Sequence, residues 1–212
     1  MKKISSTLLI VSSLLLASSC AQLMGPQKLP PLDYIDKGAK LDIKKFFNGD
    51  VEGFAIIQDA NGKIIDTQSI KINGKWEENK GIVQQLFVYA DGTKDSRTWL
   101  FTVEQDGSFE AVGHNVSGPA QGRQIGNAYQ MLYTLSVMQN GVKQPVKIED
   151  NGFLADEKSM LVISKFKKGY SASGKAIISL KKLNSKTEAK IDIAKVEILK
   201  SDKADKSDKK DE

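Results

Sequence analysis

Residues 128–137 read Ala-Tyr-Gln-Met-Leu-Tyr-Thr-Leu-Ser-Val and carry the clearest structural signal in the chain. Apolar side chains occupy every second position of this stretch: Tyr129, Met131, Tyr133, Leu135 and Val137. The positions between them are small or polar, apart from Leu132. Because successive side chains of a β-strand point to opposite faces of a sheet, this alternation predicts a strand with one face in an apolar interior.

The same alternation recurs between residues 40 and 183. Trp99, Phe101 and Val103, for example, share one face of a short segment. No window in this region keeps a helical period over three turns. We therefore expect strands over 51–59, 63–72, 81–90, 98–103, 108–116, 128–137, 143–149, 159–166 and 172–182.

Turn signals separate these segments. Asn-Gly begins at residues 48, 61, 73, 140 and 151, and Asp-Gly begins at residues 91 and 106. Both dipeptides tolerate the positive φ that two-residue hairpin turns require. Short antiparallel strands joined by hairpins predict an all-β fold, an antiparallel up-and-down β-barrel of eight to ten strands.

A glycine series around Pro119 comprises Gly118, Gly122 and Gly126. A phosphate-binding loop would need a strand–turn–helix context, which this segment lacks. We interpret these glycines as bends or bulges at a corner of the barrel.

Composition excludes several classes of protein. The 212 residues include one cysteine and one histidine, too few for a disulfide scaffold or for nearly every Cys/His zinc site. We expect no metal and no cofactor. Lys and Arg number 31 against 26 Asp and Glu, and no basic stripe with interleaved aromatic residues is present. The sequence therefore gives no support to nucleic-acid binding.

The first nineteen residues are typical of a bacterial signal peptide. Lys2 and Lys3 precede an apolar run that is too short to span a bilayer, and small residues lead to Cys20. This pattern predicts a lipobox, in which the thiol of Cys20 is acylated and becomes the mature first residue. The alternative is an ordinary signal peptide cut near a stray thiol. Ala21 follows the cysteine rather than Asp, which favours the outer membrane, facing the periplasm.

The chain divides into five segments. After the signal peptide of residues 1–19, residues 20–39 hold three prolines and predict a tether between lipid and domain. Residues 40–183 form the expected barrel. Residues 184–199 are ambiguous, and their Ile and Val content favours one further strand. Residues 200–212 alternate lysine with acidic residues and predict a disordered, charged tail.

A series of motifs makes the chain resemble a family of bacterial envelope lipoproteins catalogued as domain of unknown function 3833. The resemblance extends over roughly residues 41–183 and implies a lipid-anchored, lipocalin-like barrel with no established activity. The matching motifs are Phe46-Phe47-Asn48-Gly49, Gly53, Gln58-Asp59, Gly62, Gly74-Lys75-Trp76, Tyr89, Asp91-Gly92, Arg97 with Trp99, Gly126-Asn127-Ala128, Tyr133 and Ser164-Lys165-Phe166.

Some positions depart from the family pattern. Gln85 stands where a Glu is usual, Met131 where a Trp is usual, and His114-Asn115-Val116 where an acidic residue before Val is usual. An Asp-Asp-Trp motif is expected near Asn151 and is absent. The chain is thus similar to a divergent member of the family.

The sequence contains no catalytic constellation, and we do not expect an enzyme. His114 is the only histidine, and no serine lies in a Gly-x-Ser-x-Gly elbow. Glu149 and Asp150 are adjacent on an expected strand, so they point to opposite faces and cannot share one substrate.

Two groups of residues are candidates for a binding site. The first comprises aromatic and apolar residues expected to line the barrel: Trp99, Phe101, Tyr129, Met131 and Tyr133. They line a ligand cavity or fill a core, and the sequence leaves both open. The second is polar: Asp59 and Arg97, as an inward-facing pair at the barrel mouth, and His114. The alternatives are a turn-capping Asp59, a surface Arg97 and a half-buried strand histidine.

Two functions follow from this reading. The first is a lipid-anchored envelope lipoprotein, attached to the membrane through its N-terminal lipid, that binds or carries an apolar small molecule or lipid. The alternative is a ligand-free structural or interaction subunit in maintenance of the cell envelope.

Overall fold

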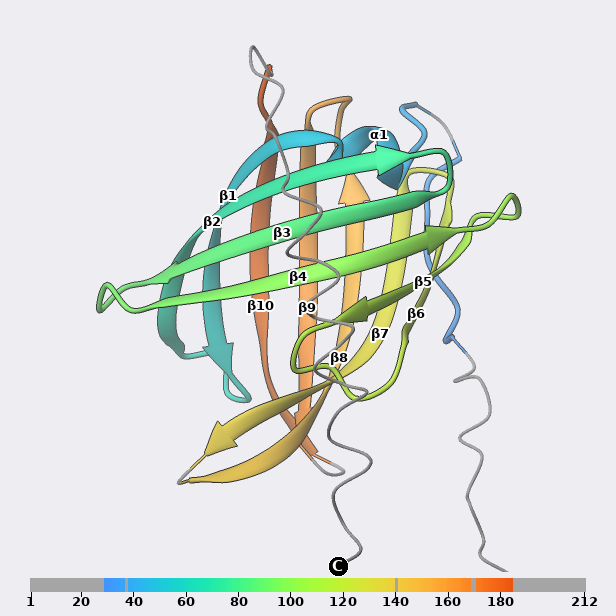
Figure 1. Cartoon of the computed structure of the whole chain (residues 1–212). Coiled ribbons are helices and arrows are strands. Elements are labelled where there is room, and N and C mark those ends of the chain that lie inside the picture. Colours follow the sequence, from blue (N-terminus) through green and yellow to red (C-terminus); the bar gives the residue numbers. More distant parts are fainter. Residues whose placement is uncertain (1–28, 37, 140, 169–170, 185–212) are drawn as a thin grey trace, which may run out of the picture.

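The computed structural model describes residues 29–36, 38–139, 141–168 and 171–184. Within them, ten antiparallel strands close into one barrel (Figure 1). Each strand pairs with its neighbours in the sequence, and the last pairs with the first. The prediction of an up-and-down all-β barrel is confirmed. The strands are β1 Gly49–Asp59, β2 Ile64–Glu77, β3 Lys80–Tyr89, β4 Lys94–Val103, β5 Ser108–Gly113, β6 Ala120–Ile125, β7 Ala128–Gln139, β8 Val142–Leu154, β9 Ser159–Lys168 and β10 Ser171–Lys182.

Four of the predicted glycine turns join strands as expected. Gly62, Gly92, Gly107 and Gly141 have φ of 83°, 82°, 84° and 76° and lie in the β1–β2, β3–β4, β4–β5 and β7–β8 connections. Two other Asn-Gly pairs, which begin at residues 73 and 151, lie inside strands rather than in turns. Their glycines are needed for packing, since a side chain at either position would collide with a neighbouring atom. A Cβ on Gly74 would lie 1.8 Å from the carbonyl oxygen of Phe47, and one on Gly152 would lie 2.0 Å from the ring of Tyr129.

Strand β6 corrects the interpretation of the Gly118, Gly122 and Gly126 series. Gly122 lies within β6, where a Cβ would come within 2.2 Å of the Phe109 ring on β5. Only Gly118 and Gly126, with φ of 73° and 55°, lie in connections. The middle glycine therefore allows a large ring to pack inside the barrel, and the segment pairs as a strand with β5 and β7.

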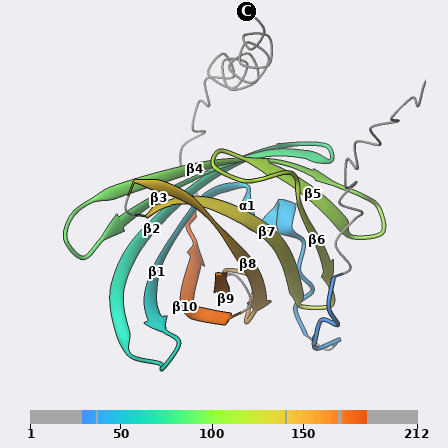
Figure 2. The ribbon, with the colours of Figure 1, turned by 90° about the horizontal axis from the view of Figure 1, so that it is seen from below.

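A one-turn helix, α1 (Ile43–Phe47), closes one end of the barrel. Viewed from below, α1 lies within the ring of strands (Figure 2). Asp42 caps it by accepting hydrogen bonds from the backbone N–H groups of Lys44 and Lys45. Ile43 and Phe46 are buried and join the core of the barrel.

Part of the expected tether packs on the outside of the barrel. The backbone N–H of Ile35 donates to Oδ1 of Asn127 at 2.8 Å, in the β6–β7 turn. The guanidinium of Arg123 on β6 donates to the carbonyl oxygen of Pro30. Pro30 and Ile35, in the segment predicted as a tether, are therefore fixed to the β6–β7 side of the barrel.

Several predictions concern parts of the chain outside the described residues. They are the signal peptide, Cys20 and the first part of the tether, the further strand over 184–199 apart from its first residue, and the charged tail over 200–212. Among the described residues, no helix has both the length and the apolar character needed to cross a membrane.

Candidate ligand-binding cavity

The barrel encloses a cavity of about 620 Å³. Its walls are mainly apolar and come from all strands except β6, together with Ile43 and Phe47 of α1. All five residues predicted to face the interior line it: Trp99, Phe101, Tyr129, Met131 and Tyr133. The alternation along residues 128–137 thus places its apolar face inside the barrel.

Packing fills the part of the interior next to α1. Val83, Trp99 and Met131 are 2%, 3% and 5% exposed, and the rings of Trp99 and Tyr133 meet edge to face with centroids 5.1 Å apart. These residues serve as core and as cavity floor at once. The two alternatives for the aromatic face, a filled core or a ligand wall, therefore apply at different depths of the same barrel.

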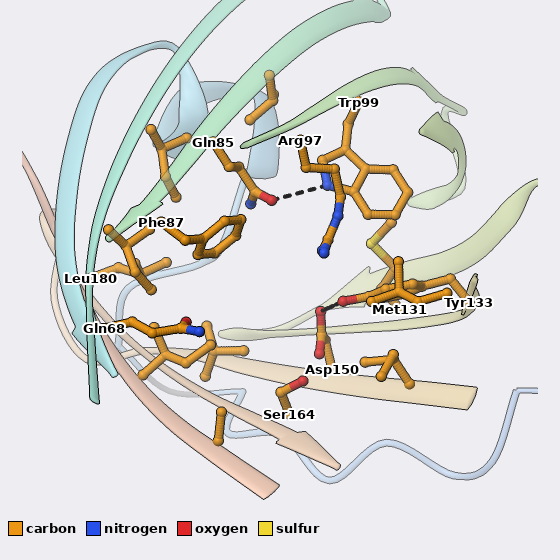
Figure 3. Close-up of a pocket in the computed structure, with 18 of the residues that line it drawn as sticks. Gln68, Gln85, Phe87, Arg97, Trp99, Met131, Tyr133, Asp150, Ser164 and Leu180 are labelled. Carbon is orange, nitrogen blue, oxygen red and sulfur yellow. Dashed lines mark hydrogen bonds between the residues drawn. The ribbon is translucent and has the colours of Figure 1, made fainter. Parts of the chain in front are cut away.

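A belt of polar side chains crosses the middle of the cavity (Figure 3). On one wall, the Trp99 indole N–H donates to Oε1 of Gln85 at 3.1 Å. On the other wall, the Tyr133 hydroxyl donates to Oδ2 of Asp150 at 3.0 Å. Ser164 on β9 pairs across from Asp150 and points toward its carboxylate.

Arg97 on β4 lies in this belt without an acidic partner. Its guanidinium carbon is 5.5 Å from the centroid of the Phe87 ring and 5.8 Å from that of Trp99. The guanidinium makes no hydrogen bond or ion pair with another described residue. The guanidinium projects into the cavity and faces Asp150 across it (Figure 3).

The environment of Asp150 disfavours its charge. Burial, the largest cause, raises the pKa of this carboxyl above the ordinary 3.8, and the charge of Glu149 adds to the rise. The hydroxyls of Ser164 and Tyr133 and the charge of Arg97 act in the opposite direction. Oδ1 of Asp150 is buried and makes no hydrogen bond within the described part of the chain.

The tyrosines of β7 are neutral hydrogen-bonding groups. Burial raises the pKa of both Tyr129 and Tyr133 well above 10.0, and the nearby carboxylate of Asp150 raises it further. Tyr133 is therefore protonated at neutral pH and donates to Asp150. The Trp76 indole N–H also lines the cavity, is buried, and has no partner among the residues described.

The structure does not bring the predicted polar residues together. The carboxylate of Asp59 accepts hydrogen bonds from the backbone N–H groups of Asn61 and Lys63 at 2.9 and 3.0 Å. It caps the β1–β2 turn and forms no pair with Arg97, so the inward-facing pair at the mouth is wrong and the turn-capping alternative describes Asp59. His114 is exposed in the β5–β6 connection and does not line the cavity, whereas Arg97 does.

Sequence reasoning missed Asp150 as a cavity residue. Alternation along β8 places it on the same face as Ile148 and Val146, and Glu149 on the outer face, where it pairs with Lys165 at 3.5 Å. Register pairs Asp150 directly with Met131, which was expected to face inward. The pairing with Met131 was the signal that could have placed Asp150 in the cavity. No group of three or more His, Cys, Asp or Glu side chains suited to a metal ion occurs within the described residues.

The closed antiparallel barrel with an internal cavity defines a lipocalin-like protein. The chain belongs to the family described as protein of unknown function DUF3833, whose profile matches residues 20–182, and the predicted family is confirmed. No curated protein matches the sequence.

The structure of the S-type phycobiliprotein lyase CPES from Guillardia theta is similar to this one, with a TM-score of 0.52. The similarity covers 69% of this chain and 95% of the lyase chain, at 8% sequence identity. At that identity the likeness shows the fold alone.

Proposed function

We propose that this protein is a lipid-anchored envelope lipoprotein that binds an apolar small molecule or a lipid inside its barrel. The single observation that carries the proposal is the internal cavity of about 620 Å³ with mainly apolar walls. Cavities of roughly 300–1,000 Å³ with a few polar groups on apolar walls are typical of small-molecule sites. Binding without catalysis agrees with the absence of a nucleophile–base pair in the sequence.

The anchor is supported by the sequence around Cys20. Ten residues from Cys20 to Leu29 extend over at most about 35 Å, so an acylated Cys20 would hold the barrel close to the bilayer. The chain meets the outer face of β6 at Pro30. Pro30 therefore lies on the outside of the barrel, where it leaves the interior free for a ligand.

Titration with the neutral apolar dye Nile red tests the binding proposal. We expect saturable binding of one dye per barrel. Leu135 is half-buried and lines the cavity, so Leu135→Trp should occupy part of its volume and weaken dye binding about tenfold, or ~1.4 kcal/mol.

Leu161→Trp is the matched control, because Leu161 lies on β9, is 42% exposed and does not line the cavity. This variant should bind the dye like the parent. If the parent binds no dye, or both variants weaken binding equally, the cavity is not a binding site and the ligand-free structural role is favoured.

A further inference from the structure

The polar belt indicates which class of ligand the cavity takes. We propose that the ligand is a single-chain amphiphile with a carboxylate head group, such as a fatty acid, which lies against Arg97 with its chain toward the end opposite α1. This inference rests on the proposed function and adds to it the chemistry of the head group and the direction of the chain.

Arg97 is the group that requires an anion. Its cationic guanidinium offers five N–H donors in a planar fork that matches a carboxylate. In this cavity none of these donors has an acceptor among the described residues, and only the rings of Phe87 and Trp99 hold the cation. Arg97 is half-buried, and a ligand carboxylate in the cavity completes the belt by accepting from these donors.

The acidic groups of the lining do not neutralise Arg97. Asp150 lies across the cavity, beyond ion-pair distance, and its Oδ2 already accepts a hydrogen bond from Tyr133. Asp95 lies on the same strand, is exposed, and accepts a hydrogen bond from the backbone N–H of Ser96. Neither acidic group of the lining therefore forms an ion pair with Arg97.

Asp150 offers a second contact to the same head group. Its carboxyl group lies across the cavity from Arg97 (Figure 3), where the Tyr133 hydroxyl holds Oδ2. A ligand carboxylate that accepts from the Arg97 fork therefore has the Asp150 carboxyl group on its other side. A cationic head group would find no such arrangement, because Arg97 would repel it.

The packing on either side of the belt sets the direction of the chain. Toward α1, the row next to Arg97 consists of Gly74, Val83 and Trp99, and the buried side chains of Val83 and Trp99 form a closed floor. Away from α1, half-buried apolar residues line the cavity: Phe87, Leu135, Val146, Phe166 and Ile178. An apolar chain therefore finds contact surface on the side opposite α1.

A comparison of dodecanoate with dodecanol at pH 8, by displacement of Nile red, tests the head group. The two probes share their chain and differ in charge. Because hydrogen bonds to charged groups contribute about 1.5–3 kcal/mol, we expect the parent to bind dodecanoate about 10- to 100-fold more tightly than dodecanol. In Arg97→Gln this preference should disappear.

Lys94→Gln is the control for loss of one positive charge from β4, since Lys94 is exposed and does not line the cavity. It should keep the preference for dodecanoate. If the parent binds dodecanoate and dodecanol equally well, the head-group assignment is overturned. This comparison needs no variant, so it tests the assignment even if Arg97→Gln fails to fold. Nile red binding by the same sample separates this outcome from failure of the proposed function, in which no probe binds.

Brominated dodecanoates test the chain direction, because bromine quenches tryptophan only near contact. Trp99 lies beside Arg97, and Trp76→Phe removes the other tryptophan. We expect 2-bromododecanoate to quench Trp99 fluorescence more strongly than 12-bromododecanoate. Stronger quenching by the 12-bromo acid would place the chain end at the floor and overturn the assigned direction.

Discussion

The hydroxyl of Tyr133 donates a hydrogen bond to Oδ2 of Asp150 at 3.0 Å, although strand register pairs Asp150 with Met131. The bond is therefore diagonal across β7 and β8 and joins two groups of the interior. It fixes one carboxylate oxygen of Asp150 and leaves the other, Oδ1, without a partner. This pair holds the acidic side of the polar belt in place opposite Arg97.

The raised pKa of Asp150 predicts how Asp150→Asn changes stability with pH. Between pH 3.8 and the raised folded-state pKa, the folded protein retains a proton that the unfolded chain has released. The free energy of unfolding contributed by this group therefore falls as pH rises through that window. Because Asn cannot titrate and still accepts from Tyr133, the melting temperature of Asp150→Asn should rise relative to the parent from pH 4 toward pH 7.

Asp106→Asn provides a control of opposite sign. Hydrogen bonds from the Ser108 hydroxyl and N–H lower the pKa of Asp106, so its stabilisation is present above the unfolded pKa and is lost at lower pH. Asp106→Asn should therefore lose stability relative to the parent as pH rises toward 3.8, and the difference should stay constant above that pH. Parallel thermal scans of both variants check the signs, and a flat difference for Asp150→Asn would contradict the account of its burial.

Gly152→Ala should destabilise the barrel, because its Cβ would lie 2.0 Å from the Tyr129 ring. Overpacking of this kind costs about 1–3 kcal/mol in the free energy of unfolding. In a Tyr129→Ala background the ring is gone, so the added cost of Gly152→Ala should nearly vanish. Urea denaturation of the four proteins in this double-mutant cycle measures the coupling. If the two substitutions lower the free energy of unfolding additively, Gly152 is not needed to make room for the Tyr129 ring.

Cys20→Ser should release the protein from membranes and abolish its labelling with fatty acids. Each buried methylene of an acyl chain contributes roughly 0.8 kcal/mol, so loss of the chains removes essentially all affinity for the bilayer. Ala21→Ser keeps the thiol and should remain membrane-bound. Sedimentation of Cys20→Ser with salt-washed membranes would refute the lipid anchor.

Much of the fold was predictable, because alternation along residues 128–137 depends only on which face is buried. The features of the fold that the sequence did not predict involve glycines that serve packing rather than turns. Gly74 and Gly152 sit in Asn-Gly pairs that resemble turns, yet they make room for Phe47 and the Tyr129 ring inside strands. Strand β6 was missed because Gly122 interrupts its pattern to admit Phe109.

The cavity wall was predictable to a smaller extent. Five apolar residues followed from alternation, but the positions of polar groups depend on strand register, which links residues far apart in sequence. Asp150 enters the interior opposite Met131, and an aspartate is seldom expected there. Asp59 lies in a motif beside a turn, and its carboxylate accepts hydrogen bonds from backbone N–H groups of that turn.

Native mass spectrometry of the domain, purified from its own cells in a detergent-free buffer, tests the central claim most directly. The account predicts a mass above that of the polypeptide by one small amphiphile per barrel, which organic extraction removes and returns as a free acid. Leu135→Trp should carry less of it than Leu161→Trp. A bare polypeptide mass, together with failure to take up dodecanoate or Nile red, would contradict the account and show that the cavity holds no ligand.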